Sequence, residues 1–406
     1  MIKTLTLEKK NELNNLLSQI AVSLDITETQ FKNLVNSYNA VGRYLEEDPE
    51  FKSFNPLVTP QGSLRLGTII QPITEDGDID VDLVFRLNGK LPSWTQKDIK
   101  TLVGNRLRNH GIYNRMLDTE GRRCWTLLYR QDTENIKERY HMDILPCISE
   151  AKFNQHYNIL RSRGYSSNII DSIAIRITDN KDPNYRTSKN ITEWLKSNPD
   201  GYAMWFADRC KSISDSRENL FETIMPIGEY IKDKTILQRI VQILKRHRDI
   251  MFKDDEDKPI SIIITTLAAR AYNGENSLIE GLYNVINSME KYISKDFYGN
   301  CLVTNPVNKE ENFADKWSIH PKRKNNFFNW LNKVKLDVNN IIDSTGIQLK
   351  ENVGEAFGLE FSVNVFNLIA EQHKQCVNNG NVRIGSTGGL GSVGSVLNAK
   401  NTFYGK

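Results

Sequence analysis

One segment, residues 61–85, constrains the fold of this chain more than any other: QGSLRLGTIIQPITEDGDIDVDLVF. Gln61, Gly62 and Ser63 precede a short apolar run that could begin a helix. A helix start offers unpaired backbone N–H groups and a positive dipole end, which suit a phosphate. Gly62 lets the backbone approach a ligand closely, and Ser63 adds a hydroxyl. The pattern predicts a phosphate cradle; Arg65 could face the phosphates or, slightly favoured, the solvent.

Alternating aspartates follow the cradle at positions 76, 78, 80 and 82. The apolar run after Asp82 predicts a strand over 79–87, which favours Asp80 and Asp82, whereas 76–78 reads as a solvated turn. Residues two apart in a strand point to one face, where two carboxylates repel each other unless a cation lies between them. Oxygen ligands beside substrate phosphates are the usual setting for Mg²⁺. Two such ions could clamp the attacking and leaving oxygens of an in-line phosphoryl displacement.

A third carboxylate, Asp143, lies in the apolar run RYHMDILP, residues 139–146, which predicts a strand ended by Pro146. An acid among Met, Ile and Leu costs burial energy unless it is paired or bound to a metal. We therefore expect Asp80, Asp82 and Asp143 to be metal ligands and catalytic groups for Mg²⁺, with Mn²⁺ as an alternative ion. The competing interpretation is a structural salt-bridge cluster. His141 shares the strand face of Asp143, and we expect it to be structural.

Composition bounds the class of protein. At 406 residues, two lobes are expected. A net charge of +3 is too mild to indicate DNA binding through charge alone. No stretch approaches 18 apolar residues, so no membrane association is expected. Five scattered cysteines give no zinc motif and fit free thiols in a reducing cytoplasm.

Hydrophobic periodicity predicts the remaining elements. Residues 5–46 read as helix, with a break or a capping box at Thr27 and Gln30. Residues 96–109 read as helix, and 124–130 with 140–146 as two strands. The stretch 176–202 is polar and rich in turns, with a short helix near Glu193–Lys196, while 237–252 and 258–272 read as helices, the second one buried.

The Gly-Ser motif, the Asp-x-Asp motif and the later strand aspartate, together with the segments around them, resemble the CD-NTases. These are bacterial cyclic-oligonucleotide synthases of anti-phage (CBASS) defence that are related to animal cyclic GMP–AMP synthase and oligoadenylate synthase. The segments that carry the resemblance are spread over roughly half of the chain: PQGSLRLGTIIQP (60–72), DVDLVFRL (80–87), YHMDILP (140–146), LQRIVQILKRHRDIMF (237–252) and KPISIIITTLAARAY (258–272).

This resemblance implies an α+β fold, in which a polymerase-beta-like nucleotidyltransferase lobe, a mixed sheet with helices, is followed by a helical C-terminal lobe. The expected divisions are bracing helices over 1–46, the nucleotidyltransferase core over 47–175, an interlobe segment with the helical lobe over 176–379, and a tail over 380–406. The tail is rich in Gly, Ser and Asn, which predicts flexibility.

The resemblance also implies the reaction: Mg²⁺-dependent joining of nucleoside triphosphates into a cyclic di- or trinucleotide, with pyrophosphate released. ATP and GTP are the favoured substrates, cyclic GMP–AMP the favoured product, and a separate effector protein the receiver of the signal. Some family members are conjugated through their C-termini by partner enzymes. Gly405 fits such a handle, but the final Lys406 departs from it.

Three residues of the second half complete the expected site. Lys245 and Arg248 share one helix face, which by charge pattern alone favours a solvated basic surface. The resemblance implies instead that Lys245 contacts a triphosphate, with Arg248 beside it. Ser261 reads as an N-cap, and the resemblance implies a phosphate contact.

Three other functions share features of this pattern. A template-independent RNA nucleotidyltransferase of the CCA-adding, poly(A) or oligoadenylate type would use the same three acids, but would usually need a basic acceptor surface. A nucleotidyltransferase toxin that modifies protein or tRNA is the second alternative. A non-catalytic nucleotide-binding module is the third, and the complete set of acids argues against it.

Overall fold

The computed structural model describes residues 5–73, 79–130, 139–149, 173–211, 230–253 and 255–378, with the residue pairs 383–384, 390–391 and 396–397. The chain forms two compact units. The sheet unit consists of Ile26–Gln238 and Lys295–Asp315; the helical unit consists of Met1–Asp25, Arg239–Ser294 and Lys316–Lys406. Each unit therefore draws on stretches that are far apart in the sequence.

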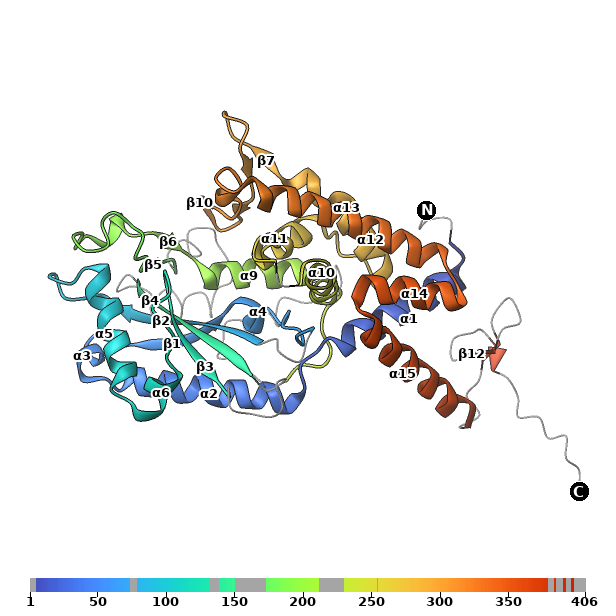
Figure 1. The fold of residues 1–406 in the computed structure, drawn as a ribbon, viewed down its shortest axis with the longest axis horizontal. Helices are drawn as coiled ribbons and strands as arrows, with labels where there is room; N and C mark the ends of the chain where they lie inside the picture. Colours follow the sequence, from blue (N-terminus) through green and yellow to red (C-terminus); the bar gives the residue numbers. More distant parts are fainter. Residues whose placement is uncertain are drawn as a thin grey trace, which may run out of the picture. The chain divides into compact units, whose positions relative to one another are not determined.

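The sheet unit is built on a mixed six-stranded sheet of order β1-β2-β4-β5-β6, in which β3 also pairs with β4 (Figure 1). Strands β2 and β4 run parallel, and the other pairs are antiparallel. The strands are β1 Leu57–Gln61, β2 Ile79–Asn88, β3 Trp125–Tyr129, β4 Tyr140–Ser149, β5 Ile175–Ile177 and β6 Lys196–Ser197.

Helices cover this sheet. They are α2 Glu28–Glu46, α3 Pro49–Lys52, α4 Gly62–Arg65, α5 Gln96–Arg108, α6 Gly111–Met116 and α9 Pro199–Cys210, with the 3-10 turn η3 Ile191–Glu193. The predicted strand over 79–87 and helix over 96–109 are confirmed. So is the capping box, because the Thr27 and Gln30 side chains each accept a hydrogen bond from the other's backbone N–H.

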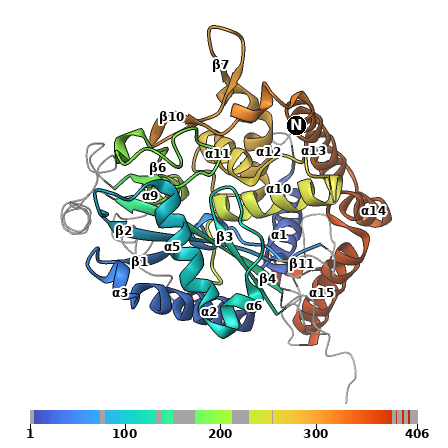
Figure 2. The ribbon, with the colours of Figure 1, turned by 60° about the vertical axis from the view of Figure 1, so that its left-hand side comes forward.

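Apolar residues at every second position of β2 place one face of the sheet in the core. Ile79, Val81 and Leu83 are at most 3% exposed and pack with Val41 of α2 and Val103 of α5. Both ribbon views show α2 running along the sheet (Figures 1 and 2). The intervening residues of β2, including Asp80 and Asp82, therefore lie on the other face.

The prediction that this strand ends at Pro146 is wrong, because β4 continues to Ser149. Residues 140–144 pair with β3 on one edge, and 147–149 pair with β5 on the same edge. Pro146 lies between these two stretches, where the missing N–H costs no ladder bond to either partner. Its carbonyl instead accepts a hydrogen bond from the Thr178 N–H at 3.3 Å.

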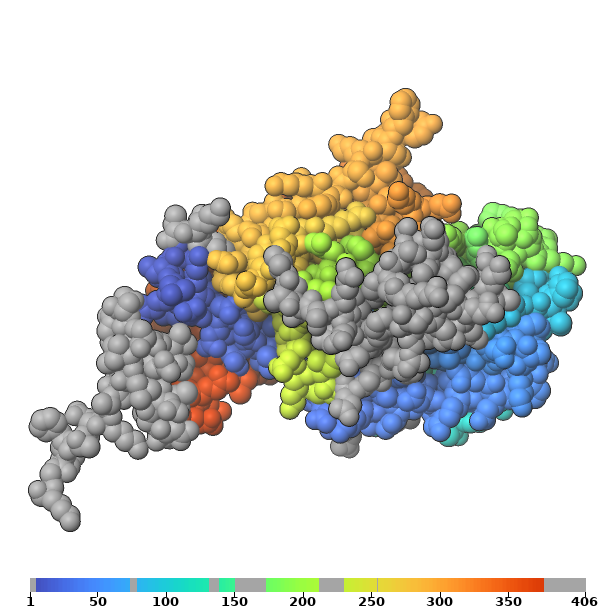
Figure 3. All heavy atoms as spheres, turned by 180° about the vertical axis from the view of Figure 1, so that it is seen from behind, coloured from blue at the N-terminus to red at the C-terminus, as the bar shows by residue number. Residues whose placement is uncertain are grey.

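The polar stretch 176–202 belongs to the sheet unit. It contributes most of β5, the edge strand β6 and the start of α9, and η3 lies close to where a short helix was expected. Short strands also occur further on: β7 Ser294–Lys295, β8 Cys301–Leu302, β9 Thr304–Asn305 and β10 Asn308–Asn312. The turn between β7 and β8 projects into solvent (Figure 3), and its Phe297 is 97% exposed.

The helical unit contains α1 Leu7–Ser23, most of α10 Ile236–Phe252, α11 Ser261–Ala271, α12 Leu278–Ser288, α13 Pro321–Asp343, α14 Gly346–Phe357 and α15 Leu359–Asn378, with the 3-10 turns η5 Met289–Tyr292 and η6 Asp315–Trp317 at its boundaries. Helix α11 is buried, as predicted. No described helix is long and apolar enough to cross a bilayer. The mixed sheet and the helical unit confirm the α+β expectation.

The expected divisions 1–46 and 176–379 each contribute to both units. Helix α1 belongs to the helical unit because it pairs with distant residues: the Lys10 ammonium lies 2.9 Å from a Glu280 carboxylate oxygen, and the Asn14 side chain accepts a hydrogen bond from the Leu278 N–H. The predicted tail lies largely outside the described residues. Its described pairs, β11 Arg383–Ile384, β12 Leu390–Gly391 and β13 Val396–Leu397, form a small sheet.

A buried ion cluster joins three elements of the sheet unit. Asp200, in the first turn of α9, lies 2.9 Å from Arg65 Nη2 of α4 and 2.5 Å from Arg86 Nη2 of β2. All three side chains are at most 6% exposed. Burial raises the pKa of Asp200, but the charges of Arg86 and Arg65 outweigh burial and hold that pKa below its ordinary value. The cluster therefore fixes α4 against the sheet.

We predict that Asp200→Ala lowers the free energy of unfolding by about 3–5 kcal/mol, because it leaves two buried guanidinium groups without their shared carboxylate. Urea-induced unfolding followed by circular dichroism measures the loss. Asp208→Ala is the matched control: Asp208 lies on the same helix, is 62% exposed and pairs only at the surface with Lys211, so its removal costs less than about 1 kcal/mol. Equal losses would contradict a stabilising cluster.

Candidate active site

A single row of side chains crosses four strands of the sheet. Gln61 of β1 is paired with Asp82 of β2, Asp82 with Asp143 of β4, and Asp143 with Thr126 of β3. Directly paired residues of neighbouring strands point to the same face. The end of the predicted cradle, two predicted acids and a threonine thus form one continuous polar row.

Asp80 lies on the same face, two residues before Asp82, and is paired with His141. Asp80 is exposed, whereas Asp82, Asp143 and His141 are half-buried. The prediction that the three acids share one sheet face is therefore consistent with the strand register, and the other two aspartates, Asp76 and Asp78, lie outside the described residues. Within the described ranges, no three or more His, Cys, Asp or Glu side chains lie close enough together to hold a metal ion.

The donor chemistry of this row nevertheless suits a divalent cation. Carboxylate oxygens are the ligands that Mg²⁺ and Mn²⁺ prefer. A nearby thiol reports the local negative charge: burial, together with the charges of Asp143 and Asp82, raises the pKa of Cys124 to about 12. Two half-buried carboxylates on adjacent strands repel each other, so a bound cation would relieve an existing cost.

The cradle touches this row through Gly62, the first residue of α4. Its φ is +61°, and a Cβ placed on it would lie 2.1 Å from Asp82 Oδ2. Only glycine allows both the backbone conformation and the close approach. Gln61 precedes α4 without capping it through its side chain, and Ser63 follows within the same short turn. The predicted neighbourhood of cradle and carboxylate is therefore present.

Arg65 does not face the solvent, so that expectation is wrong. Its guanidinium donates to the Pro60 carbonyl at 3.1 Å and pairs with Asp200. A sequence pattern cannot show such a burial, because the partner lies 135 positions away in a stretch that reads as polar turns. For the same reason, the sequence did not identify Asp200 as a partner of Arg65. The helix start itself could have been recognised, because Asn198 as N-cap, Pro199 at the first position and an acid in the first turn are a usual combination.

Lys245, Arg248 and Ser261 belong to the helical unit. The interpretation of Lys245 and Arg248 as a solvated basic face is wrong, since the two residues are only 7% and 6% exposed. Arg248 donates to the Ser261 hydroxyl at 2.9 Å and to the Pro259 carbonyl at 3.0 Å. Ser261 is the first residue of α11 rather than its N-cap, which is Ile260. Arg248 therefore holds the start of α11 and orients the Ser261 hydroxyl.

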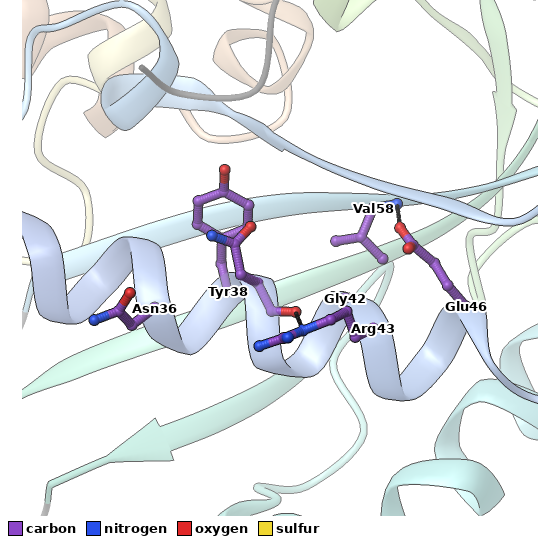
Figure 4. Close-up of a pocket in the computed structure, with 7 residues that line it drawn as sticks. Asn36, Tyr38, Gly42, Arg43, Glu46 and Val58 are labelled. Carbon is purple, nitrogen blue, oxygen red and sulfur yellow. Dashed lines mark hydrogen bonds between the residues drawn. The ribbon is translucent and has the colours of Figure 1, made fainter. Parts of the chain in front are cut away.

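A pocket of about 480 Å³ lies between α2 and β1 (Figure 4). Its lining is mostly polar: Asn36, Tyr38, Asn39, Gly42, Arg43, Glu46 and Val58. Glu46 accepts a hydrogen bond from the Val58 N–H at 2.7 Å. None of the predicted site residues lines this pocket. Helix α2 packs on the core face of the sheet, so the pocket is separate from the row of acids on the other face.

Comparison with known proteins agrees with this geometry. Residues 56–146 match the family described as "Cyclic GMP-AMP synthase DncV-like, nucleotidyltransferase domain". A curated relative, c-di-GMP synthase of Roseivirga ehrenbergii, is 29% identical over 349 residues, covering 85% of this chain and 83% of its own.

Solved structures share the fold at lower identity. The CD-NTase CdnG of Bradyrhizobium diazoefficiens, in complex with GTP, has a TM-score of 0.64 at 17% identity, covering 88% of this chain and 99% of its own. DncV cyclic AMP-GMP synthase of Vibrio cholerae, in complex with the linear intermediate 5′ pppA(3′,5′)pG, has a TM-score of 0.52 at 15% identity, covering 87% and 91%. These comparisons support a nucleotidyltransferase, and within that class they support a CD-NTase.

We predict that Gly62→Ala lowers nucleotidyl transfer about a hundredfold, because the new methyl group pushes the cradle away from Asp82 and a shift of about 1 Å can cost that much. Steady-state kinetics measure the loss. Gly346→Ala is the matched control: Gly346 has a similar φ of +57° but nothing within 4 Å of its Cβ position. Both variants carry about 1–2 kcal/mol of backbone strain. An equal loss of activity in both would attribute the effect to strain alone.

Proposed function

We propose that this CD-NTase joins two nucleoside triphosphates into a cyclic dinucleotide and releases pyrophosphate, in a reaction that depends on Mg²⁺ or Mn²⁺. The observation that carries the proposal is the row Gln61–Asp82–Asp143, with Gly62 in contact with Asp82. This arrangement supports the proposal because the residues predicted to bind phosphate lie beside paired carboxylates on one sheet face. The named relative is a c-di-GMP synthase, and the similar structures hold GTP or a linear dinucleotide.

In this mechanism, Asp80, Asp82 and Asp143 would hold a divalent cation through their carboxylate oxygens. A bound Mg²⁺ would neutralise charge on the reacting phosphate and make the attacking hydroxyl more acidic. Asp143 accepts the hydroxyl proton, and the backbone N–H groups and hydroxyl around Gln61, Gly62 and Ser63 bind the phosphates. The linear product then reorients in the site, and its free hydroxyl attacks the α-phosphate of the remaining triphosphate, which breaks the α–β bond and releases a second pyrophosphate.

The phosphate contacts expected of Lys245, Arg248 and Ser261 follow from the resemblance. Lys245 would provide a cation for a triphosphate, and the Ser261 hydroxyl, which Arg248 orients, would donate to a phosphate oxygen. The wider role follows the resemblance: synthesis of a signal in the cytoplasm during anti-phage defence, detected by a separate effector, with the C-terminal tail as a conjugation handle.

Product analysis identifies which bases the cyclic dinucleotide contains. The enzyme is incubated with labelled GTP alone, labelled ATP alone and both together, treated with phosphatase, and the resistant products are identified by mass spectrometry. A resistant product from GTP alone identifies cyclic di-GMP; a resistant product only from the mixture identifies cyclic GMP–AMP. A ladder of linear products would instead support a template-independent RNA nucleotidyltransferase, and no product from any NTP would contradict the proposal.

We predict that Asp80→Asn combined with Asp82→Asn lowers product formation more than about a hundredfold, because charge stabilisation worth several kcal/mol is lost. The unfolding temperature without Mg²⁺ should equal or slightly exceed that of the wild type, since repulsion is relieved. Product assays and thermal unfolding measure both effects, with the exposed Asp208→Asn as control. Wild-type rates in the double variant would refute this assignment and direct attention to Asp78.

A further inference from the structure

Thr126 ends the polar row on the side away from the cradle. Its hydroxyl donates a hydrogen bond to Asp143 Oδ1 at 2.5 Å, and the two residues are direct partners across β3 and β4. On the opposite strand neighbour, β2, Asp143 is paired with the like-charged Asp82. Asp143 is thus held between a hydroxyl donor on one side and a negative charge on the other.

We propose that Thr126 is a positioning residue that sets the orientation of the Asp143 carboxylate for cation binding; this rests on the metal-binding role proposed above. A carboxylate beside a like charge lowers its energy by rotating away from that charge. The Thr126 hydroxyl offsets this tendency, because its hydrogen bond to Oδ1 favours one rotamer of the Asp143 side chain. The bond engages Oδ1, so the Asp143 carboxylate would meet a cation in one fixed orientation.

The position of the hydroxyl is fixed by the core. The residues on either side of Thr126, Trp125 and Leu127, point to the core face and are 2% and 0% exposed. The Trp125 indole N–H also donates to the Lys100 carbonyl of α5 at 2.8 Å. A β-branched residue is stiff at χ1 and suits a strand. The donor therefore lies on a rigid element, which a supporting residue of a metal site requires.

The variants that test this role are Thr126→Val, which keeps the shape and the strand preference but removes the donor, and Thr126→Ser, which restores it. Thr59→Val is the matched control, because Thr59 is a half-buried threonine on the same sheet face of β1, two residues before the row. The two valine substitutions keep a β-branched side chain of similar size, and Thr126→Ser removes only a methyl group. Circular dichroism and the unfolding temperature check that all three variants fold.

Two readouts separate positioning from a merely structural role. The first is Mn²⁺ affinity without nucleotide, from the electron paramagnetic resonance signal of free Mn²⁺. The second is the Mg²⁺ concentration that gives half-maximal activity at saturating nucleotide. Thr126→Val should weaken both by about 10- to 100-fold, as loss of a hydrogen bond to a metal ligand does, with nucleotide KM unchanged at saturating Mg²⁺. Thr126→Ser and Thr59→Val should stay within about threefold of the wild type in each measurement.

Asp143→Asn, measured in parallel, distinguishes the two proposals. If Asp143→Asn loses Mn²⁺ binding and activity while Thr126→Val retains wild-type values, the role of Thr126 is refuted and the metal site stands. If Asp143→Asn itself retains binding and activity, the proposed metal site fails, and the role of Thr126 fails with it. If Thr126→Ser is as impaired as Thr126→Val, the methyl packing rather than the hydroxyl matters, and the positioning role is also refuted.

Discussion

The parallel pairing of β2 with β4 is the constraint on which the rest of the site depends. It makes Asp82 and Asp143 direct neighbours, so two like charges lie side by side on one face of the sheet. The register survives because a slip by one residue would turn Val81, Leu83 and Met142 out of the core. The apolar packing on one face of the sheet therefore offsets the repulsion between the carboxylates on the other face.

Two contacts extend this arrangement to the cradle. Asp200 ties the end of α4 to β2 through Arg65 and Arg86, and Gly62 brings the start of α4 against Asp82. Both ends of a helix of four residues are thus fixed relative to one strand. A turn this short has little stability of its own, so its geometry is imposed by its surroundings rather than by its sequence.

Local patterns were sufficient for the strands and for the face that the acids share, because alternation and helical periodicity are properties of neighbouring residues. They failed where a charge finds its partner far along the chain. Arg65 and Arg248 each read as solvated, yet one is paired with Asp200 and the other holds the start of α11. Thr126 was missed because its importance comes from cross-strand register, which no single segment contains. The same limit explains why α1 and α2, adjacent in sequence, belong to different units.

The outer edge of β1 shows how the sheet is protected against unwanted pairing with other chains. Glu46 occupies the Val58 N–H, Pro60 has no N–H to offer, and Arg65 occupies the Pro60 carbonyl. An edge strand with free donors and acceptors would be a template for intermolecular β-sheet growth and aggregation. In this chain the outer edge of the strand that leads directly into the cradle has these backbone groups occupied or missing, so it is a poor template for such growth.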